Sequence, residues 1–215
     1  MGKSVAIIGV ILLFAIVAAA QDTPRMETFL GYTYVRANSA TNVPSFSANG
    51  GSGQYAYNFN KWISGVADLG AVHNGNIGGL PLDSTFANFL FGPRISLRYS
   101  RFRPYFQVLW GGVYGTSSTA VDVIPVNPDQ PIFLPGTKTL ETIPGAITAR
   151  VVASQTAFAM TAGGGFDIKL SKHVMFRPIG LDYYMTRLQN LRTQGDNNQN
   201  NLRYTAGFDF TFGAQ

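Results

Sequence analysis

The sequence predicts an all-β protein, an eight-stranded antiparallel up-and-down barrel that spans a membrane. Three observations lead to this prediction: polar and apolar residues alternate with a period of two, long and short connections alternate strictly, and no apolar run after residue 20 is long enough for a helical span. A barrel inserted from one side of a membrane has short turns on one face and longer loops on the other. A soluble sandwich or closed barrel has no reason to sort its loops in this way.

Eight segments show this alternation and are bounded by turn-forming residues. The expected strands are Glu27–Arg36, Ser52–Asn60, Trp62–Val72, Thr85–Tyr99, Phe102–Thr116, Thr156–Leu170, Val174–Leu188 and Asn201–Gly213. Long loops are expected near 37–51, 73–84, 117–155 and 189–200, and tight turns at Asn60–Lys61, Ser100–Arg101 and Ser171–His173. A tilted span needs about 9–11 residues, and most of these segments are close to or above that length.

The N-terminal segment has the layout of a signal peptide. Lys3 supplies a positive charge, Val5–Val17 is an apolar run, and Ala18–Ala20 are the small residues that precede a cleavage site. The alternative is a retained transmembrane helix, because the apolar run approaches the shortest length that spans a bilayer. The alanines and the polar residues after them favour cleavage. We therefore expect an exported protein with a signal peptide at 1–20 and one barrel domain at 21–215.

The composition indicates that water is not the only solvent of the surface. Aromatic residues make up 13% of the chain and charged residues only 13%, against a usual charged share of about 25%. The chain has no cysteine, which excludes a disulfide framework and a thiolate metal site. A chain without cysteine also suits export in an unfolded state.

The direction of the apolar face separates a membrane barrel from a soluble one. The last strand shows the faces best, because the even positions from Leu202 to Phe212 are apolar or aromatic and the residues between them are polar or small. A soluble barrel turns its apolar face inward, whereas a membrane barrel turns it outward to lipid. A water-facing sheet would carry more Lys and Glu, whereas small residues and a few charges suit a cramped lumen. Aromatic residues near strand ends fit interfacial girdles, although a soluble core would also hold them.

Two expected strands depart from clean alternation. In the seventh strand, Arg177 and Asp182 have opposite parity, so both point inward only if a bulge lies between them. Otherwise Arg177 lies at the rim of the barrel. In the third strand, Val66 shares a face with Asp68. The sequence leaves the inward or outward phase of these two strands open.

Charged residues on the polar faces are candidates for a network inside the lumen. They are Asp68, Arg94, Arg98, Asp167, Lys169, Asp182, Arg203 and Asp209. An unpaired ion in that narrow space would be costly, so we expect salt bridges that plug the barrel. We expect Arg94 and Arg98 to pair with carboxylates of neighbouring strands. An eight-stranded interior is filled by side chains and leaves no wide channel.

A second group of basic residues lies where the first, seventh and eighth strands meet the long loops. Its members are Arg36, Arg187, Arg192 and Arg203. These arginines are candidates to bind lipid phosphates or sugars at the outer leaflet through charge-assisted hydrogen bonds. The alternative is a solvated basic rim.

The sequence shows no constellation for catalysis. His73 opens a loop and His173 lies in a tight turn, and neither has a second histidine or a carboxylate at ligand-like spacing. Gly163–Gly165 is no phosphate loop, because no Lys-Ser/Thr follows it. We therefore expect no enzyme, no catalytic residue, no cofactor and no metal. The 117–155 loop carries five prolines with Val, Ile, Leu and Phe between them, and loops of this length are usually functional or disordered. The apolar residues between the prolines suggest that this loop packs on itself or on a partner.

With these strands and turns, the chain resembles the OmpA-type eight-stranded outer-membrane barrels, specifically the short single-domain porin-like proteins. The resemblance covers roughly 27–213 and is carried by NFNKWISGVAD, FLFGPRISLR, GGGFDIKLSKHV, RPIGLDYYMTR and LRYTAGFDFTFG. It implies a place in the cell outer membrane, contact with outer-membrane lipids including lipopolysaccharide, and recognition of the C-terminal strand by the barrel-assembly machinery. Phe212 takes the place of the family's C-terminal aromatic residue, although three residues follow it. No nucleic-acid partner is expected.

The expected function is a structural or adhesive one. We expect a monomeric outer-membrane barrel that presents its loops to a partner while polar and charged side chains plug its lumen. The first alternative is a narrow porin-like channel for small solutes, which conductance would reveal. An enzyme acting on lipids would need His-Ser or His-Asp arrangements that the sequence lacks. A soluble lipocalin-like carrier would not depend on detergent.

Overall fold

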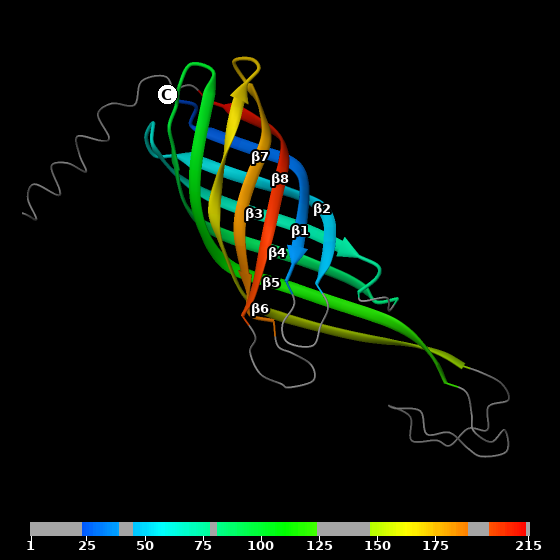
Figure 1. Ribbon diagram of the computed structural model, residues 1–215. Coiled ribbons are helices and arrows are strands. Elements are labelled where there is room, and N and C mark those ends of the chain that lie inside the picture. Colours follow the sequence, from blue (N-terminus) through cyan, green and yellow to red (C-terminus); the bar gives the residue numbers. More distant parts are fainter. Residues whose placement is uncertain (1–22, 39–44, 78–80, 124–146, 189–197, 214–215) are drawn as a thin grey trace, which may run out of the picture.

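The computed structural model describes residues 23–38, 45–77, 81–123, 147–188 and 198–213. Eight antiparallel strands form one closed barrel, in which each strand pairs with its neighbours in sequence and β8 pairs with β1 (Figure 1). The strands are β1 (Met26–Ala37), β2 (Phe46–Asn58), β3 (Ile63–Asn74), β4 (Asp83–Ser96), β5 (Phe102–Val123), β6 (Ile147–Lys169), β7 (Val174–Thr186) and β8 (Gln199–Phe212). The predicted fold class is confirmed. The predicted signal peptide lies outside the described residues.

The connections are sorted between the two ends of the barrel. The turns β2–β3, β4–β5 and β6–β7 lie at one end, here called the short-turn end (Figure 1). The strand ends that the other connections join lie at the opposite end, here called the long-loop end. Both ends of the barrel domain meet at the short-turn end, where the Arg25 amide donates to the Gly213 carbonyl at 3.0 Å. None of the described residues forms a helix long and apolar enough to cross a membrane.

Three strands extend well beyond the segments that the sequence predicted. β2 begins at Phe46, because its ladder with β1 continues to Ala37. β5 and β6 pair as far as Val123 and Ile147, well into the segment expected as a loop. Both extensions are rich in Val, Thr and Ser, and the β-branched residues among them favour strands. The resulting hairpin projects beyond the other strands at the long-loop end (Figure 1).

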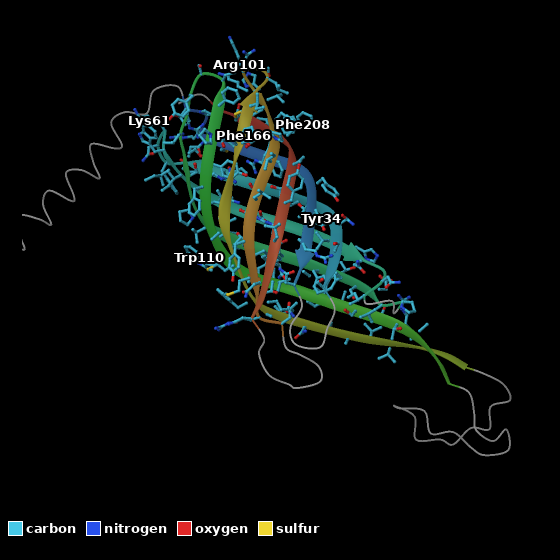
Figure 2. The ribbon with its side chains drawn as sticks, viewed as in Figure 1. Tyr34, Lys61, Arg101, Trp110, Phe166 and Phe208 are labelled. Carbon is cyan, nitrogen blue, oxygen red and sulfur yellow. The ribbon has the colours of Figure 1, made fainter. Side chains whose placement is uncertain are left out.

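Apolar side chains cover the outside of the wall. Leu69, Phe91 and Phe106 are 60%, 54% and 54% exposed, and Figure 2 shows Trp110 and Phe208 on the outer surface. This is the polarity of a membrane barrel rather than of a soluble one. Two tyrosines, Tyr105 and Tyr184, point inward rather than toward the lipid-facing side of the wall. Each ring forms a cation–π contact with a buried arginine, Tyr105 with Arg94 and Tyr184 with Arg203.

The interior has a polar part and an apolar part. The polar part contains the charged side chains described below. The apolar part includes Val35, Val72, Val113 and Leu188, with the Phe46 and Phe86 rings stacked at 5.9 Å. Because the lumen is partly apolar, the third strand keeps a regular phase with both Val66 and Asp68 directed inward.

A bulge in β7 explains its mixed parity. The register of β7 against β8 shifts between Arg177 and Gly180, beside Pro178, which has no amide hydrogen to donate. The shift turns both Arg177 and Asp182 into the lumen, at 0% and 2% exposure, so Arg177 does not lie at the rim. A Cβ at Gly180 would lie 2.8 Å from the Tyr105 hydroxyl oxygen, so glycine leaves room for that inward ring.

Candidate functional site in the barrel lumen

The polar part of the lumen holds ten charged side chains of balanced sign, here called the lumen network. Nine are buried and Arg98 is half-buried. The five cations are Arg94, Arg98, Arg103, Arg177 and Arg203, and the five anions are Glu27, Asp68, Asp167, Asp182 and Asp209. The alternation of each strand directs these residues inward, where a matched set of charges avoids the cost of an unpaired buried ion.

Arg103 is the centre of the layer nearest the short-turn end. Its guanidinium lies 2.6 Å from Glu27, 2.6 Å from Asp167 and 2.8 Å from Asp209, which come from three different strands. The contact between Arg103 Nη1 and Glu27 is an ion pair that does not have the geometry of a hydrogen bond. Arg98 provides a second cation to Glu27 at 2.9 Å. Burial holds the pKa of Arg98 below its ordinary value, although Glu27 opposes this shift, and the guanidinium keeps its charge.

Arg177 occupies the middle of the lumen. Its Nε lies 2.7 Å from Asp167, and its Nη1 donates to Gln54 Oε1 on β2 at 2.9 Å. The guanidinium carbon lies 4.1 Å from the centre of the Phe29 ring and 4.4 Å from that of the Tyr105 ring. Cation–π contact with two rings stabilises this arginine in the middle of the lumen.

Arg203 and Arg94 differ in their partners. Arg203 on β8 forms ion pairs with Asp68 on β3 at 3.0 Å and with Asp182 on β7 at 2.8 Å. Arg94 has no carboxylate partner within the described ranges. It donates to Gln107 Oε1 at 2.8 Å and to Gln54 Oε1 instead, and it stacks on Tyr105.

The comparisons with known proteins agree with this architecture. The family model described as "Outer membrane protein beta-barrel domain" matches residues 6–213. The chain belongs to this family. Membership places the barrel in an outer membrane. No curated protein matches the sequence.

Several solved outer-membrane barrels share the fold. Ail, the attachment invasion locus protein of Yersinia pestis, has 13% sequence identity and a TM-score of 0.54, covering 88% of this chain and 99% of its own. Neisserial surface protein A has 12% identity and a TM-score of 0.56, covering 87% of this chain and 97% of its own. Ail bound to the heparin analogue sucrose octasulfate gives a TM-score of 0.52 at 13% identity, covering 87% of this chain and 97% of its own. At these identities the likeness shows the fold alone.

Seven of the eight residues expected in the lumen of this outer-membrane barrel are brought together there. They are Asp68, Arg94, Arg98, Asp167, Asp182, Arg203 and Asp209. Lys169 is exposed instead and forms no ion pair with another described residue. It is the last residue of β6, so it lies at the mouth of the barrel rather than within the lumen.

The partners of the arginines differ from those expected. Arg98 pairs with Glu27 across the lumen rather than with a neighbouring strand, and Arg94 binds two glutamines. Of the other three members of the lumen network, sequence reasoning missed Glu27 and Arg103 and left the direction of Arg177 open. Strand parity could have found Arg103, because it alternates with Phe102 and shares a face with Gln107.

The four rim arginines do not form one cluster. Arg36 is exposed and donates to Ser45 and Ser47, at 2.8 Å and 3.0 Å. Arg187 is exposed and donates to Asn198 at 3.0 Å. Arg203 does not lie at the rim. It lies within β8 (Gln199–Phe212), at a position whose side chain points into the lumen, and it is buried in the lumen network. Arg192 lies outside the described residues.

The two histidines occupy exposed positions at opposite ends of the barrel. His73 Nδ1 lies 3.5 Å from Asp83 and 3.2 Å from the Thr85 hydroxyl. Both contacts fall on the same ring nitrogen, so the group cannot relay a proton as a catalytic triad does. His173 Nδ1 lies 3.3 Å from the Thr211 carbonyl. The part of the chain that the structure describes holds no group of three or more His, Cys, Asp or Glu suited to a metal ion.

Proposed function

We propose that this protein is a closed, non-conducting barrel that presents its long-loop end to a partner at the cell surface. The observation that carries the proposal is the lumen network, whose ion pairs join opposite walls of the barrel. Arg103 on β5 reaches Glu27 on β1, and Arg203 on β8 reaches Asp68 on β3. An ion that crossed the lumen would have to separate charges that are buried and paired, which costs several kcal/mol for each pair.

An apolar layer adds a second barrier to permeation. Val35, Val72, Val113 and Leu188 are buried in the interior and belong to one cluster. A hydrophobic constriction opposes the entry of water and ions. Ionic and apolar layers in series support a plugged lumen better than either layer alone.

The projecting β5–β6 hairpin supports the second half of the proposal. β4 pairs with β5 only as far as Ser118, and β7 pairs with β6 only as far as Ala159. Beyond these points the hairpin continues to Val123 and Ile147 with strand edges that no other described strand covers. An exposed edge can add a strand from a partner, with main-chain hydrogen bonds providing affinity. Val151 and Val152, 55% and 62% exposed, add apolar contact area.

Recordings in planar bilayers test the closed lumen. We expect the purified barrel to insert without stable single-channel conductance. The variant Arg94→Ser is designed to open the lumen. It removes a large buried side chain without breaking an ion pair, because Arg94 has no ion pair with another described residue. This variant should show a higher ion leak. Stable, large conductance of the unmodified barrel would favour the narrow channel instead.

Adhesion assays test the presenting role. Residues 118–152 would be replaced by an Asn-Gly turn between the paired residues Ser117 and Ala153, which suits a two-residue hairpin and removes Val151 and Val152. Cells displaying this shortened barrel should adhere less to cultured cells than cells with the full barrel. A control would replace residues 39–44 at the β1–β2 connection, leaving β5 and β6 intact. Equal adhesion of full and shortened barrels would refute a role for the hairpin.

A further inference from the structure

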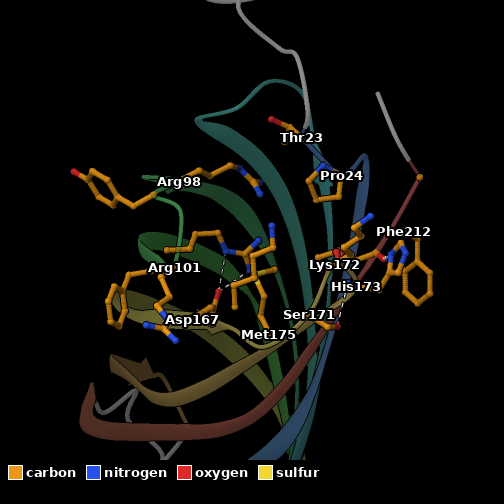
Figure 3. A pocket seen from close by; sticks show the side chains of 16 residues that line it. Thr23, Pro24, Arg98, Arg101, Asp167, Ser171, Lys172, His173, Met175 and Phe212 are labelled. Carbon is orange, nitrogen blue, oxygen red and sulfur yellow. Dashed lines mark hydrogen bonds and ion pairs between the residues drawn. The ribbon is translucent and has the colours of Figure 1, made fainter.

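A recess opens at the mouth of the barrel on the short-turn end. Its volume is about 750 Å³, and its walls are the β4–β5 and β6–β7 turns together with the two ends of the barrel domain. Figure 3 shows Arg98 on one side of the recess, with Lys172 and His173 on the other. The charged lining residues are Arg98, Arg101, Arg103, Lys169, Lys172 and Asp167.

The lining carries a surplus of positive charge. Among the described residues that line the recess, Asp167 is the only carboxylate, and it is already paired with Arg103 and Arg177. Arg101, Lys169 and Lys172 are exposed and have no ion-pair partner in the described ranges. The lumen network is balanced by itself, so the described charges beneath the recess do not offset these three cations.

The surroundings extend this positive surface. Arg25 and Lys61 also lie at the short-turn end, where Figure 2 shows Lys61 and Arg101. The described residues of the turns and domain ends at this side include no carboxylate. A concave surface lined by one sign of charge concentrates the field and attracts counter-ions. At the long-loop end, in contrast, Arg150 is already paired with Asp83 at 3.2 Å.

Arg98 gives the recess a donor of fixed orientation. Its Nε donates to the Lys61 carbonyl at 3.1 Å, and its Nη2 donates to Glu27 at 2.9 Å. These two bonds hold the guanidinium plane, while Nη1 has no partner among the residues that the structure describes. Arginine held in this way, beside lysines that can adjust, is a combination suited to phosphate oxygens.

We propose that this recess binds a compact anion with two or more phosphate groups, which enters from the periplasmic side. Short turns face the periplasm in barrels of this kind, so the recess is open to that compartment. Arg98 would hold one phosphate, and Arg101, Lys169 and Lys172 would neutralise the remaining charge. The phosphates belong either to a soluble solute or to the headgroup of an inner-leaflet lipid. The site lies at the opposite end from the hairpin and does not depend on its role.

Calorimetric titration of the full chain with tripolyphosphate, in a zwitterionic detergent at low salt, tests the site. We expect saturable binding of one tripolyphosphate to each barrel. The variant Arg101→Gln/Lys172→Gln should bind about tenfold or more weakly, because each charge-assisted contact is among the stronger hydrogen bonds. Arg36→Gln/Arg187→Gln removes the same charge from the other end and should change affinity less than about twofold. Heat-modifiable migration on gels verifies that all variants fold.

Two results would overturn the proposal. One is the lack of saturable binding to the unmodified barrel, and the other is an equal loss of affinity in both double variants, which would indicate attraction to net charge alone. Nanodiscs separate the two sources of phosphate. If cardiolipin added to phosphatidylcholine nanodiscs competes with tripolyphosphate, the recess accepts a lipid headgroup; if it does not compete, the ligand is a soluble solute. Both outcomes retain the phosphate site.

Discussion

Arg103 on β5 lies 2.6 Å from Glu27 on β1, so an ion pair joins two walls of the barrel that share no backbone ladder. Arg98 binds the same carboxylate from the β4–β5 turn at 2.9 Å. Glu27 therefore connects the first strand to the strands on the far side of the barrel. Closure of the barrel by β1 and β8 is reinforced at the short-turn end by side chains.

Glu27→Gln should destabilise the barrel strongly. The substitution keeps the shape of the side chain but leaves Arg98 and Arg103 with less negative charge, and breaking a buried pair costs about 3–5 kcal/mol. Urea unfolding in detergent micelles would measure the loss. Asp83→Asn breaks the exposed pair with Arg150 and should cost no more than about 1 kcal/mol. Similar losses in the two variants would show that the lumen network contributes little.

Arg203→Met should cost more stability than Arg94→Met. Removing Arg203 leaves Asp68 and Asp182 without their cation, whereas Arg94 is bound by neutral glutamines. We expect a loss of about 3–5 kcal/mol for Arg203→Met and about 1–3 kcal/mol for Arg94→Met.

The control for this comparison neutralises Asp68 and Asp182, the two carboxylates that lose their cation in Arg203→Met. Adding Asp68→Asn and Asp182→Asn to Arg203→Met should restore part of the lost stability, because the remaining groups are then uncharged. The same two changes in the unmodified barrel should destabilise it. If the triple variant is no more stable than Arg203→Met, electrostatic pairing is not the reason for the loss.

Strand parity and loop length were sufficient to predict the barrel, because both are local properties of the chain. Parity also predicted the inward direction of Arg94, Asp167 and Asp209. It could not predict which groups meet, since contacts across the lumen depend on how the strands tilt and close. The partner of Arg98 illustrates this limit, because Glu27 is 71 residues away in sequence and on another wall.

The departures from the predicted strands also have local physical causes. Pro178 lies where the register of β7 shifts, and this shift directs Arg177 inward. In a regular strand, Arg177 and Asp182 would point to opposite faces, because they are five residues apart. The 117–155 segment, which contains five prolines, was expected as a loop. These begin only at Pro125, so the β-branched residues before them remain free to extend β5.

Gly180→Ala should destabilise the barrel by about 1–3 kcal/mol, the usual cost of overpacking. The added methyl group would lie 2.4 Å from Thr205 Oγ1 and 2.8 Å from the Tyr105 hydroxyl oxygen. Combining it with Thr205→Ala removes the nearest atom and should recover a large part of the loss. A double-mutant cycle of thermal unfolding midpoints measures this coupling. Additive losses would mean that the two positions do not compete for space.

Phe212→Ala should reduce delivery to the outer membrane without a matching loss of stability. Phe212 is 53% exposed at the end of β8, where it pairs in register with Met26 beside the closing seam. We expect the barrel-assembly machinery to recognise an aromatic ring at that position before the seam closes. Phe208→Ala is the matched control, because it removes an outward ring of similar exposure, 46%, from the same strand. Quantifying folded barrel in membrane fractions, alongside refolding in micelles, separates assembly from stability. An equal reduction in delivery for both variants would remove the special role of the terminal ring.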